Sequence, residues 1–360
     1  MSWSSKTLHV AIIGYGLAGA VFHGPLIAST PGMMVAAIVT SSPERQERAR
    51  RNFPSAVILS KPEDLWHHAS HYDLVVVASP NRTHMPLGIA AMEAGLPVVI
   101  DKPMAASVAD AERLMEVSER TGKLLSVFQN RRWDNDFLTV QYLLNTDLDL
   151  LGPIIRFESR FERWRPVPKM GAWRELGEPE EAGGLLYDLG SHLIDQALVL
   201  FGEPTQVYAE VERRRAGVLV DDDTFVALQF ASGVRAHLWM SVVSRLLGPR
   251  MRLLGLRGTY EKYGLDPQED ALSRGIRPGD VSWGMEPRER WGRLATEVGG
   301  VSLDSPVETL PGAYQQYYIL LRDALLKGGK PPVEATEVLR TLKVIEAAQE
   351  SARSGCVVKL

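Results

Sequence analysis

The chain has 360 residues, 45% of them hydrophobic and 23% charged, and its 40 basic and 44 acidic residues give a formal net charge of −4. This length favours two domains, the composition excludes disordered, collagen-like and coiled-coil chains, and the balanced charge predicts neither a nucleic-acid partner nor a membrane surface. The one cysteine, Cys356, excludes internal disulfides and thiolate metal clusters, and without an export signal or an apolar stretch of about 18 residues the sequence predicts a cytoplasmic protein with no metal site.

Short apolar runs alternate with helical stretches in the first third of the chain, a pattern that builds a parallel sheet covered by helices. We expect strands at 8–13, 35–39, 56–59, 74–78, 98–100 and 124–127. The run at 74–78 is apolar on both faces, as a central strand must be when helices cover both sides of its sheet. Residues 87–94 fit a helix closed by Gly95. The sequence therefore predicts a doubly wound α/β domain over residues 1–127.

After residue 150 the apolar period changes to two, because Ile155, Phe157 and Phe161 alternate with charged residues. Similar patterns recur at 207–211, 225–230, 234–240 and 252–256. They predict a large, mainly antiparallel sheet, open on one face, in a C-terminal α/β domain over residues 128–360. Residues 266–304 are rich in Gly, Pro and charge and are expected to form a long surface excursion. Helices at 314–326 and 336–354 close the chain, and packing of the last one back on the first domain is an option.

A glycine-rich fingerprint follows the first expected strand and opens a helix. It consists of Gly14, Tyr15, Gly16, Leu17, Ala18 and Gly19. In this setting the first glycine makes a tight turn, the second lets a pyrophosphate approach the backbone, and the third lets the helix pack on the strand. Alone, the motif would be a common tight turn. The surrounding βαβ pattern makes it a predicted NAD(P) site and makes the first domain a predicted Rossmann fold.

The end of the second strand lacks the acidic residue that usually holds the ribose 2′-hydroxyl of NAD. Thr40, Ser41 and Ser42 stand there instead, and their small side chains leave room for a 2′-phosphate. Arg45 could neutralise that phosphate, with Arg48 a poorer candidate. Ser42 can equally be a helix N-cap and Arg45 a solvated helix charge, and both interpretations can hold together. We expect NADP as the cofactor, with NAD as the alternative.

Two further patterns indicate catalysis. Lys102 follows the strand at 98–100 and so lies at the carboxyl edge of the sheet, where its ammonium could polarise a substrate oxygen; a surface lysine is the alternative. Asp188, His192 and Asp195 are spaced to share one face of a helix, where a carboxylate one turn away can orient a proton-accepting imidazole. A solvated polar stripe is the alternative there. A metal-ligand set lacks support from any second His/Cys cluster.

In their order along the chain, the fingerprint, Lys102-Pro103 and the helix of Asp188 and His192 resemble the glucose-fructose oxidoreductase, inositol dehydrogenase and rhizopine catabolism (Gfo/Idh/MocA) family. The likeness covers essentially the whole chain, and residues 127–134 are most similar to the NADP-linked scyllo-inositol dehydrogenase-like branch. The resemblance implies that Lys102, His192 and Asp188 are catalytic and that the Lys102–Pro103 peptide is cis. It also implies residues that line the cofactor and substrate cleft: Ser79, Pro80, Asn81, His84, Asp101, Lys102, Asn130 and Arg131. Asp101 departs from the Glu that many relatives have before Lys-Pro.

These patterns predict an NAD(P)-dependent oxidoreductase that moves a hydride between nicotinamide and a hydroxyl or carbonyl carbon of a small polar substrate. The resemblance narrows that substrate to a sugar, an inositol or a similar polyol, with Lys102 and His192 meeting around it, one from each domain. A nucleotide sensor and an NAD-dependent glycosidase of the same fold are the alternatives. We also expect a homodimer or homotetramer through the C-terminal sheet. The residues that suggest it are Val226, Leu228, Phe230 and Trp239, which one helical layer would not all cover.

Overall fold

The structure is a computed structural model that describes residues 6–168, 175 and 177–360. Its internal contacts divide the chain into two compact units, and each unit is assembled from separate stretches of sequence. The first unit comprises Met1–Asn130, Gln268–Trp283 and Ala313–Leu339. The second comprises Arg131–Pro267, Gly284–Gly312 and Arg340–Leu360. Among the described residues no helix is both long enough and apolar enough to cross a bilayer.

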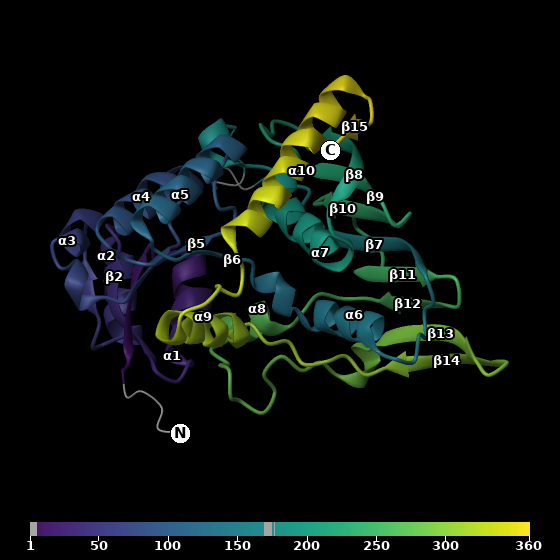
Figure 1. Ribbon diagram of the computed structural model, residues 1–360, viewed down its shortest axis with the longest axis horizontal. Coiled ribbons are helices and arrows are strands. Elements are labelled where there is room, and N and C mark those ends of the chain that lie inside the picture. Colours follow the sequence, from purple (N-terminus) through teal and green to yellow (C-terminus); the bar gives the residue numbers. More distant parts are fainter. Residues whose placement is uncertain (1–5, 169–174, 176) are drawn as a thin grey trace. The chain divides into compact units, whose positions relative to one another are not determined.

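The first unit is built on a parallel sheet, some of whose strands are labelled in Figure 1, and its strand order confirms the predicted Rossmann fold. Its strands are β1 (Leu8–Ile13), β2 (Met33–Val39), β3 (Val57–Leu59), β4 (Leu74–Val77), β5 (Val98–Asp101) and β6 (Leu125–Phe128). Within the described residues the order is β3-β2-β1-β4-β5-β6, and every pair is parallel. The order reverses between β1 and β4, where sheets of this kind bind ligands.

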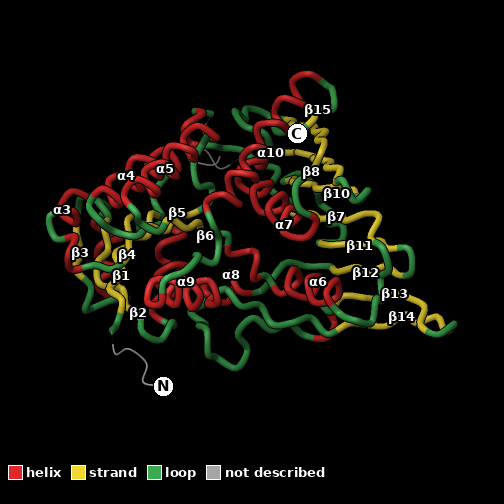
Figure 2. Tube along the Cα trace, viewed as in Figure 1, coloured by secondary structure: helices red, strands yellow, loops and turns green. Residues whose placement is uncertain are grey.

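Helices cover both faces of this sheet, which is why the side chains of β4 are fully buried. The helical segments are η1 (Ala18–His23), α1 (Gly24–Ala28), α2 (Pro43–Asn52), α3 (Pro62–Trp66), η2 (Ala69–His71), η3 (Asn81–Thr83), α4 (His84–Glu93), α5 (Val108–Thr121), α8 (Gln268–Ser273) and α9 (Gln315–Lys327). Figure 2 shows α4 beside α5, and α4 also contacts β4 and β5. On another side α1 contacts β2 and α9. A helix from late in the sequence therefore packs on α1, which in turn contacts the sheet.

The second unit is built on a mixed, mainly antiparallel sheet, as predicted. Its strands are β7 (Ile154–Glu162), β8 (Pro204–Glu212), β9 (Asp223–Phe230), β10 (Arg235–Ser241), β11 (Met251–Gly255), β12 (Gly258–Lys262), β13 (Gly292–Val298), β14 (Val301–Val307) and β15 (Val358–Lys359). Among the described residues the order is β14-β13-β12-β11-β7-β10-β9-β8-β15, and only β7 and β10 run parallel. Its helical segments are η4 (Asn130–Trp133), α6 (Asn135–Asn145), η6 (Pro179–Glu181), η7 (Leu186–Gly190), α7 (Ser191–Phe201), η8 (Arg288–Arg290) and α10 (Ala335–Ser354), of which η4 and α10 cross the division between the units.

The two faces of this sheet differ in burial, and this corrects the reasoning behind the predicted interface. Val226, Leu228 and Phe230 are at most 1% exposed, because they lie on the buried face of β9. Their neighbour Phe225 and the next strand's Trp239 alternate to the other face and remain partly exposed. A period of two identifies which residues share a face but not which face the helices cover. Trp239 is the one residue of the predicted set on the open face.

Residues 266–304 form the predicted surface excursion only in part, because 274–291 is the one long segment among them outside the α-helices and strands. They contain α8, the whole of β13 and part of β14, and β13 and β14 make an antiparallel hairpin at the edge of the sheet (Figure 1). Its turn is Gly299-Gly300, with φ of +57° and +80°, so these glycines supply a hairpin turn rather than an irregular loop. Nearly every residue of β14 is exposed. Val301, Leu303 and Val307 alternate with other residues in β14, but Ser305 interrupts the apolar pattern and Pro306 argues against a strand, so the sequence does not identify this strand.

Candidate functional site

The glycine fingerprint forms a tight turn between β1 and η1 that fits a dinucleotide. Gly14 has a φ of +97°, and a Cβ on it would overlap the carbonyl of Ala78 at the end of β4. A Cβ on Gly19 would overlap the Gly14 carbonyl, so both positions require glycine for packing. At Gly16, by contrast, a Cβ would meet nothing closer than Arg45 Nη1 at 3.8 Å. The open backbone at Gly16 is where a pyrophosphate can approach, as the motif predicts.

Tyr15 and Arg48 stabilise this turn by contacts on its buried side. The Tyr15 side chain is fully buried, and its hydroxyl accepts a hydrogen bond from Asn52 Nδ2 at 3.0 Å. Arg48 Nη2 donates to the Tyr15 carbonyl at 2.6 Å and its guanidinium lies over the Tyr15 ring. Burial raises the pKa of Tyr15 above its usual value, so the hydroxyl stays protonated. Arg48 is thus engaged with the turn itself, which leaves Arg45 as the better candidate for a ligand phosphate. Leu17, next in the fingerprint, is half exposed, and Ala18 begins η1.

The predicted 2′-phosphate residues lie at the start of α2. Ser42 is the N-cap of this helix and its hydroxyl accepts the Arg45 N–H at 3.4 Å, so the capping interpretation is correct for Ser42. Thr40 is 8% exposed, whereas Ser41 and the Arg45 side chain are exposed. Since Arg45 Nη1 also lies beside Gly16, α2 brings one exposed cation next to the open turn.

The loop after β4 carries the next group of predicted residues. Ser79 and Thr83 share a hydrogen bond between their hydroxyls at 2.6 Å, Pro80 is exposed, and Asn81 is 6% exposed. His84 begins α4 and is 1% exposed, with its Nδ1 at 2.8 Å from the Pro103 carbonyl and its Nε2 at 2.9 Å from the Ser79 carbonyl. Burial lowers the pKa of His84, against the opposing charge of Asp101. The imidazole therefore lies between two loops, and its contribution to a cofactor surface stays a prediction.

Lys102 lies at the carboxyl edge of the same sheet, directly after β5, and is partly exposed. The Lys102–Pro103 peptide is cis, which confirms what the resemblance implied. The Lys102 N–H donates to Asp101 Oδ1 at 3.0 Å. His23 Nε2 is 3.8 Å from that oxygen. Although burial alone would raise it, the pKa of Asp101 is held below its usual value by His23, His84 and Lys102. The first unit thus brings the open turn, the Ser79 loop and Lys102 to the carboxyl edge of one sheet.

In the second unit, Asp188 and His192 lie on a helix that is buried on all sides at its start. Asp188 is in η7, a π-helical turn of the kind often found at functional sites, and His192 follows in α7. They are 8% and 4% exposed, so the solvated-stripe alternative is excluded. Asp195, 2% exposed, forms a two-pronged ion pair with Arg132, at 2.7 and 2.8 Å, and its carboxylate is thereby committed to that guanidinium.

The turn before η7 is held by Asp221, a residue outside the predicted site. Its Oδ2 accepts the Leu186 N–H at 2.8 Å and the Thr224 hydroxyl at 2.7 Å, and its carbonyl accepts the Leu185 N–H at 3.1 Å. Burial raises the pKa of Asp221 despite these hydrogen bonds. Gly184 has a φ of +89°, and a Cβ on it would overlap the Asp221 carboxylate. The Gly183-Gly184 pair was the one visible sign that something packs closely there.

Asn130 and Arg131 lie in η4 and are 6% and 7% exposed. Arg131 Nη1 is 3.3 Å from Asp134 Oδ2, and its guanidinium lies 4.7 Å from the centre of the Phe161 ring. Its carbonyl accepts a hydrogen bond from Gln196, one turn after His192 on α7. Within the second unit, Arg131 is therefore connected to α7, the helix that carries His192. That Lys102, in the first unit, acts together with His192 stays a prediction.

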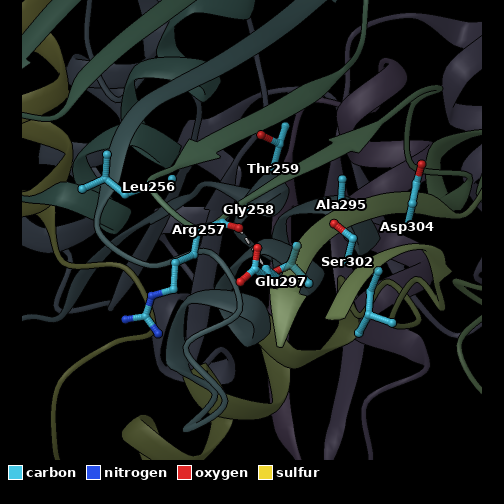
Figure 3. A pocket seen from close by; sticks show the side chains of 11 residues that line it. Leu256, Arg257, Gly258, Thr259, Ala295, Glu297, Ser302 and Asp304 are labelled. Carbon is cyan, nitrogen blue, oxygen red and sulfur yellow. Dashed lines mark hydrogen bonds between the residues drawn. The ribbon is translucent and has the colours of Figure 1, made fainter. Parts of the chain in front are cut away.

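A separate hollow of about 500 Å³ opens on the second unit among β11 to β14 (Figure 3). Its lining includes the charged residues Arg257, Glu297 and Asp304 and contains none of the predicted site residues. Among the residues that the structure describes, no group of His, Cys, Asp and Glu is arranged to hold a metal ion.

Comparison with known proteins gives matches along the whole chain. Residues 8–129 match the GFO_IDH_MocA family model, an oxidoreductase family with a NAD-binding Rossmann fold, and residues 148–360 match the model of its C-terminal alpha/beta domain. The uncharacterized oxidoreductase YdgJ of Escherichia coli is 39% identical over 97% of both chains. The NADP-dependent scyllo-inositol 2-dehydrogenase IolW of Bacillus subtilis is 37% identical over 98% of this chain and 96% of that protein. The solved structure of yvaA from Bacillus subtilis, 36% identical, superposes with a TM-score of 0.93 over 100% of both chains.

Proposed function

The chain belongs to the Gfo/Idh/MocA family of oxidoreductases, and from this membership we propose that it is an NADP-preferring dehydrogenase of a sugar, an inositol or a similar polyol. That it is an NAD(P)-dependent oxidoreductase acting on CH–OH groups follows from the family itself and from relatives that match over nearly their whole length. The observation that carries the proposal is the position of Lys102, directly after β5 at the edge where the open turn of Gly16 also lies.

When bound, a nicotinamide cofactor supplies or accepts the hydride. In the oxidative direction the substrate carbon loses that hydride and its hydroxyl loses a proton. The ammonium of Lys102 polarises the substrate oxygen, and the imidazole of His192 takes the proton, in line with the acid–base roles of such groups. Asp188, one turn earlier on the helix, orients the imidazole and stabilises its charged form. In the reductive direction the same groups return the proton.

Preference for NADP is supported by the start of α2. The acid that would hold a ribose 2′-hydroxyl is absent there, Ser41 is small and exposed, and the exposed Arg45 guanidinium lies beside the open turn at Gly16. The relative IolW is named for NADP, which agrees with this assignment. Its named substrate, scyllo-inositol, makes inositols the first substrates to test.

We also propose that the open face of the second unit's sheet joins two copies of the chain. Aromatic rings gather on it: Phe225 lies 5.2 Å from Trp239, and His237 lies within 6 Å of each. The Arg160 guanidinium covers the Trp239 ring at 3.9 Å. Aromatic and Arg side chains together are typical of the centre of protein interfaces.

The test of the catalytic assignment is to replace the two proton-handling groups. Lys102→Met and His192→Ala should each lower the turnover of scyllo-inositol with NADP by on the order of a hundredfold or more, the usual scale for a lost acid–base group. NADPH binding, measured by fluorescence titration, should stay close to that of the parent protein because the phosphates are held elsewhere. Lys330→Met, on a lysine whose side chain is 80% exposed, is the matched control and should change neither quantity.

If a substrate is found and both variants keep the parent kcat across pH, the catalytic assignment is wrong even though the fold and cofactor stand. A sensor gives a different result: the parent protein would bind NADPH yet turn over none of a broad panel of inositols and aldoses.

A further inference from the structure

We propose that two buried histidines, His23 and His84, are positioning residues that hold the Asp101–Lys102–Pro103 turn from its two sides. The inference rests on the proposed function, since it concerns the placement of the catalytic lysine. Neither histidine is close to Lys102 in sequence, and each joins the turn to a different part of the first unit. Through them the backbone from which the Lys102 side chain extends is fixed to η1 and α9 on one side and to the Ser79 loop on the other.

His84 holds the Pro103 side of the turn. Both of its ring nitrogens face carbonyl oxygens, Nδ1 that of Pro103 and Nε2 that of Ser79. A neutral imidazole has one N–H, so it donates to only one of these carbonyls, and only the imidazolium donates to both. With its proton on Nδ1, or as the imidazolium, His84 donates to the Pro103 carbonyl and so connects α4 to the residue after Lys102. At 1% exposure the imidazole has no water to replace a lost partner.

His23 holds the Asp101 side of the turn. It is fully buried, and its Nδ1 is 2.5 Å from the Tyr318 hydroxyl. Its Nε2 faces Asp101 Oδ1 at 3.8 Å, an approach longer than a hydrogen bond. The same Asp101 oxygen accepts the Lys102 N–H. A row of polar contacts therefore runs from α9 through η1 to the backbone of Lys102. The Phe128 ring, centred 4.3 Å from that of His23, fixes the imidazole in place.

Such supports matter because catalysis depends on the position of the reacting group. A displacement of about 1 Å at a catalytic group can cost up to a hundredfold in rate, even when the altered residue never touches the substrate. A merely structural role would instead lower stability and leave kcat of the folded protein unchanged. The two roles are therefore separated by kcat rather than by the unfolding temperature.

Two substitutions of His84 test its contacts with Pro103 and Ser79 separately. His84→Asn places an amide where Nδ1 lies and can still bond to Pro103, whereas His84→Gln places one near Nε2 and can still bond to Ser79. We expect His84→Asn to keep kcat within about threefold of the parent and His84→Gln to lower it by on the order of tenfold or more, with the KM for scyllo-inositol and the affinity for NADPH little changed. Equal kcat values for the two variants would overturn the assignment of His84.

Substitutions of two neighbouring tyrosines on α9 test the role of His23 on the Asp101 side of the turn. Tyr318→Phe removes the hydroxyl that contacts His23 and should lower kcat by on the order of tenfold. Tyr317→Phe is the matched control: it is equally buried, and its hydroxyl bonds to Ser126 at 2.8 Å rather than to the row that ends at Lys102. It should cost stability while leaving kcat within about twofold. The same loss of kcat in both variants would mean that the helix, and not the His23 contact, is what matters.

Hydrogen exchange gives a readout that needs no substrate. The peptide spanning residues 98–106 should exchange faster in His84→Gln and Tyr318→Phe than in His84→Asn and Tyr317→Phe, and an absence of that ordering overturns the inference. Lys102→Met separates this result from failure of the proposed function. If Lys102→Met keeps full kcat, the catalytic role is wrong; if it loses kcat while the exchange and kcat orderings are absent, only the positioning role is wrong.

Discussion

Arg45 and Arg48 lie on the same helix and differ in what they can bind. Arg48 donates to the Tyr15 carbonyl and covers the Tyr15 ring, so its charge is used within the protein. Arg45 extends from the first turn of α2 into solvent beside Gly16. The sequence alone ranks them only by distance from the strand end. The structure adds that Arg48 already binds the Tyr15 carbonyl, which leaves Arg45 available to a ligand.

This difference predicts the effect of charge on cofactor choice. Arg45→Ala should weaken NADPH binding by about tenfold or more, the scale of one lost charge-assisted hydrogen bond, and leave NADH binding nearly unchanged. Ser41→Asp should move preference towards NADH, because the carboxylate repels a 2′-phosphate and accepts from a 2′-hydroxyl. Fluorescence titration gives the dissociation constants of both nucleotides for the parent protein and for each variant. Arg50→Ala, exposed on the same helix and paired with Glu47, is the control. NADH binding equal to or tighter than NADPH binding in the parent protein would refute the preference.

At the scale of single elements, the helix of Asp188 and His192 depends on a residue outside it. Asp221→Ala leaves the Leu186 N–H and the Thr224 hydroxyl without their acceptor, and we expect it to lower the free energy of unfolding by about 2–3 kcal/mol. Urea denaturation of the whole protein measures this change in the free energy of unfolding. Asp223→Ala, two residues away and paired with an exposed Arg214 at 3.5 Å, should cost less than about 1 kcal/mol. If both variants lost the same free energy of unfolding, Asp221 would have no special role in holding the turn before η7.

Regular elements with a buried face could be predicted from the sequence. The strands of the first unit and β7 to β11 were predicted to within a few residues, because burial imposes a period that the sequence displays. β12 and the hairpin of β13 and β14 were missed, as was α6. The edge strand β14 pairs with β13 along its backbone, while Pro306 within it argues against a strand when the sequence is read alone.

The site was predictable where a motif fixes local backbone and not where it depends on distant packing. Gly14, Gly16 and Lys102 have the positions that their motifs imply. The burial of His84 between two carbonyls and the Asp195–Arg132 pair join residues 19 and 63 positions apart, and nothing in the spacing indicates such contacts. Helical spacing likewise predicted a shared face for Asp188 and His192 without predicting that the face is buried.

At the scale of the whole molecule, the open sheet face predicts self-association. We expect light scattering at micromolar concentration to give the mass of a dimer or tetramer, since an uncovered aromatic cluster of this kind usually marks an interface. Trp239→Glu should shift the mass towards the monomer by placing a charge among Phe225 and His237. Tyr142→Glu, on a 61% exposed side chain of α6, is the control and should leave the mass unchanged. A monomeric parent protein would refute the interface.

The first unit is completed by α9, a helix that is synthesised late. His23 and its partner Tyr318 are 295 positions apart, so a ribosome that adds about 5–20 residues per second completes the tyrosine roughly 15–60 s after the histidine. During that interval the nascent chain has made the whole parallel sheet, and of the two supports of the Lys102 turn it can form only the one from His84. A chain stalled before α9 would therefore expose His23 and Phe128, the surface that α9 later covers, to chaperones and proteases. The turn that carries Lys102, in the first third of the chain, is among the last segments to acquire all its contacts.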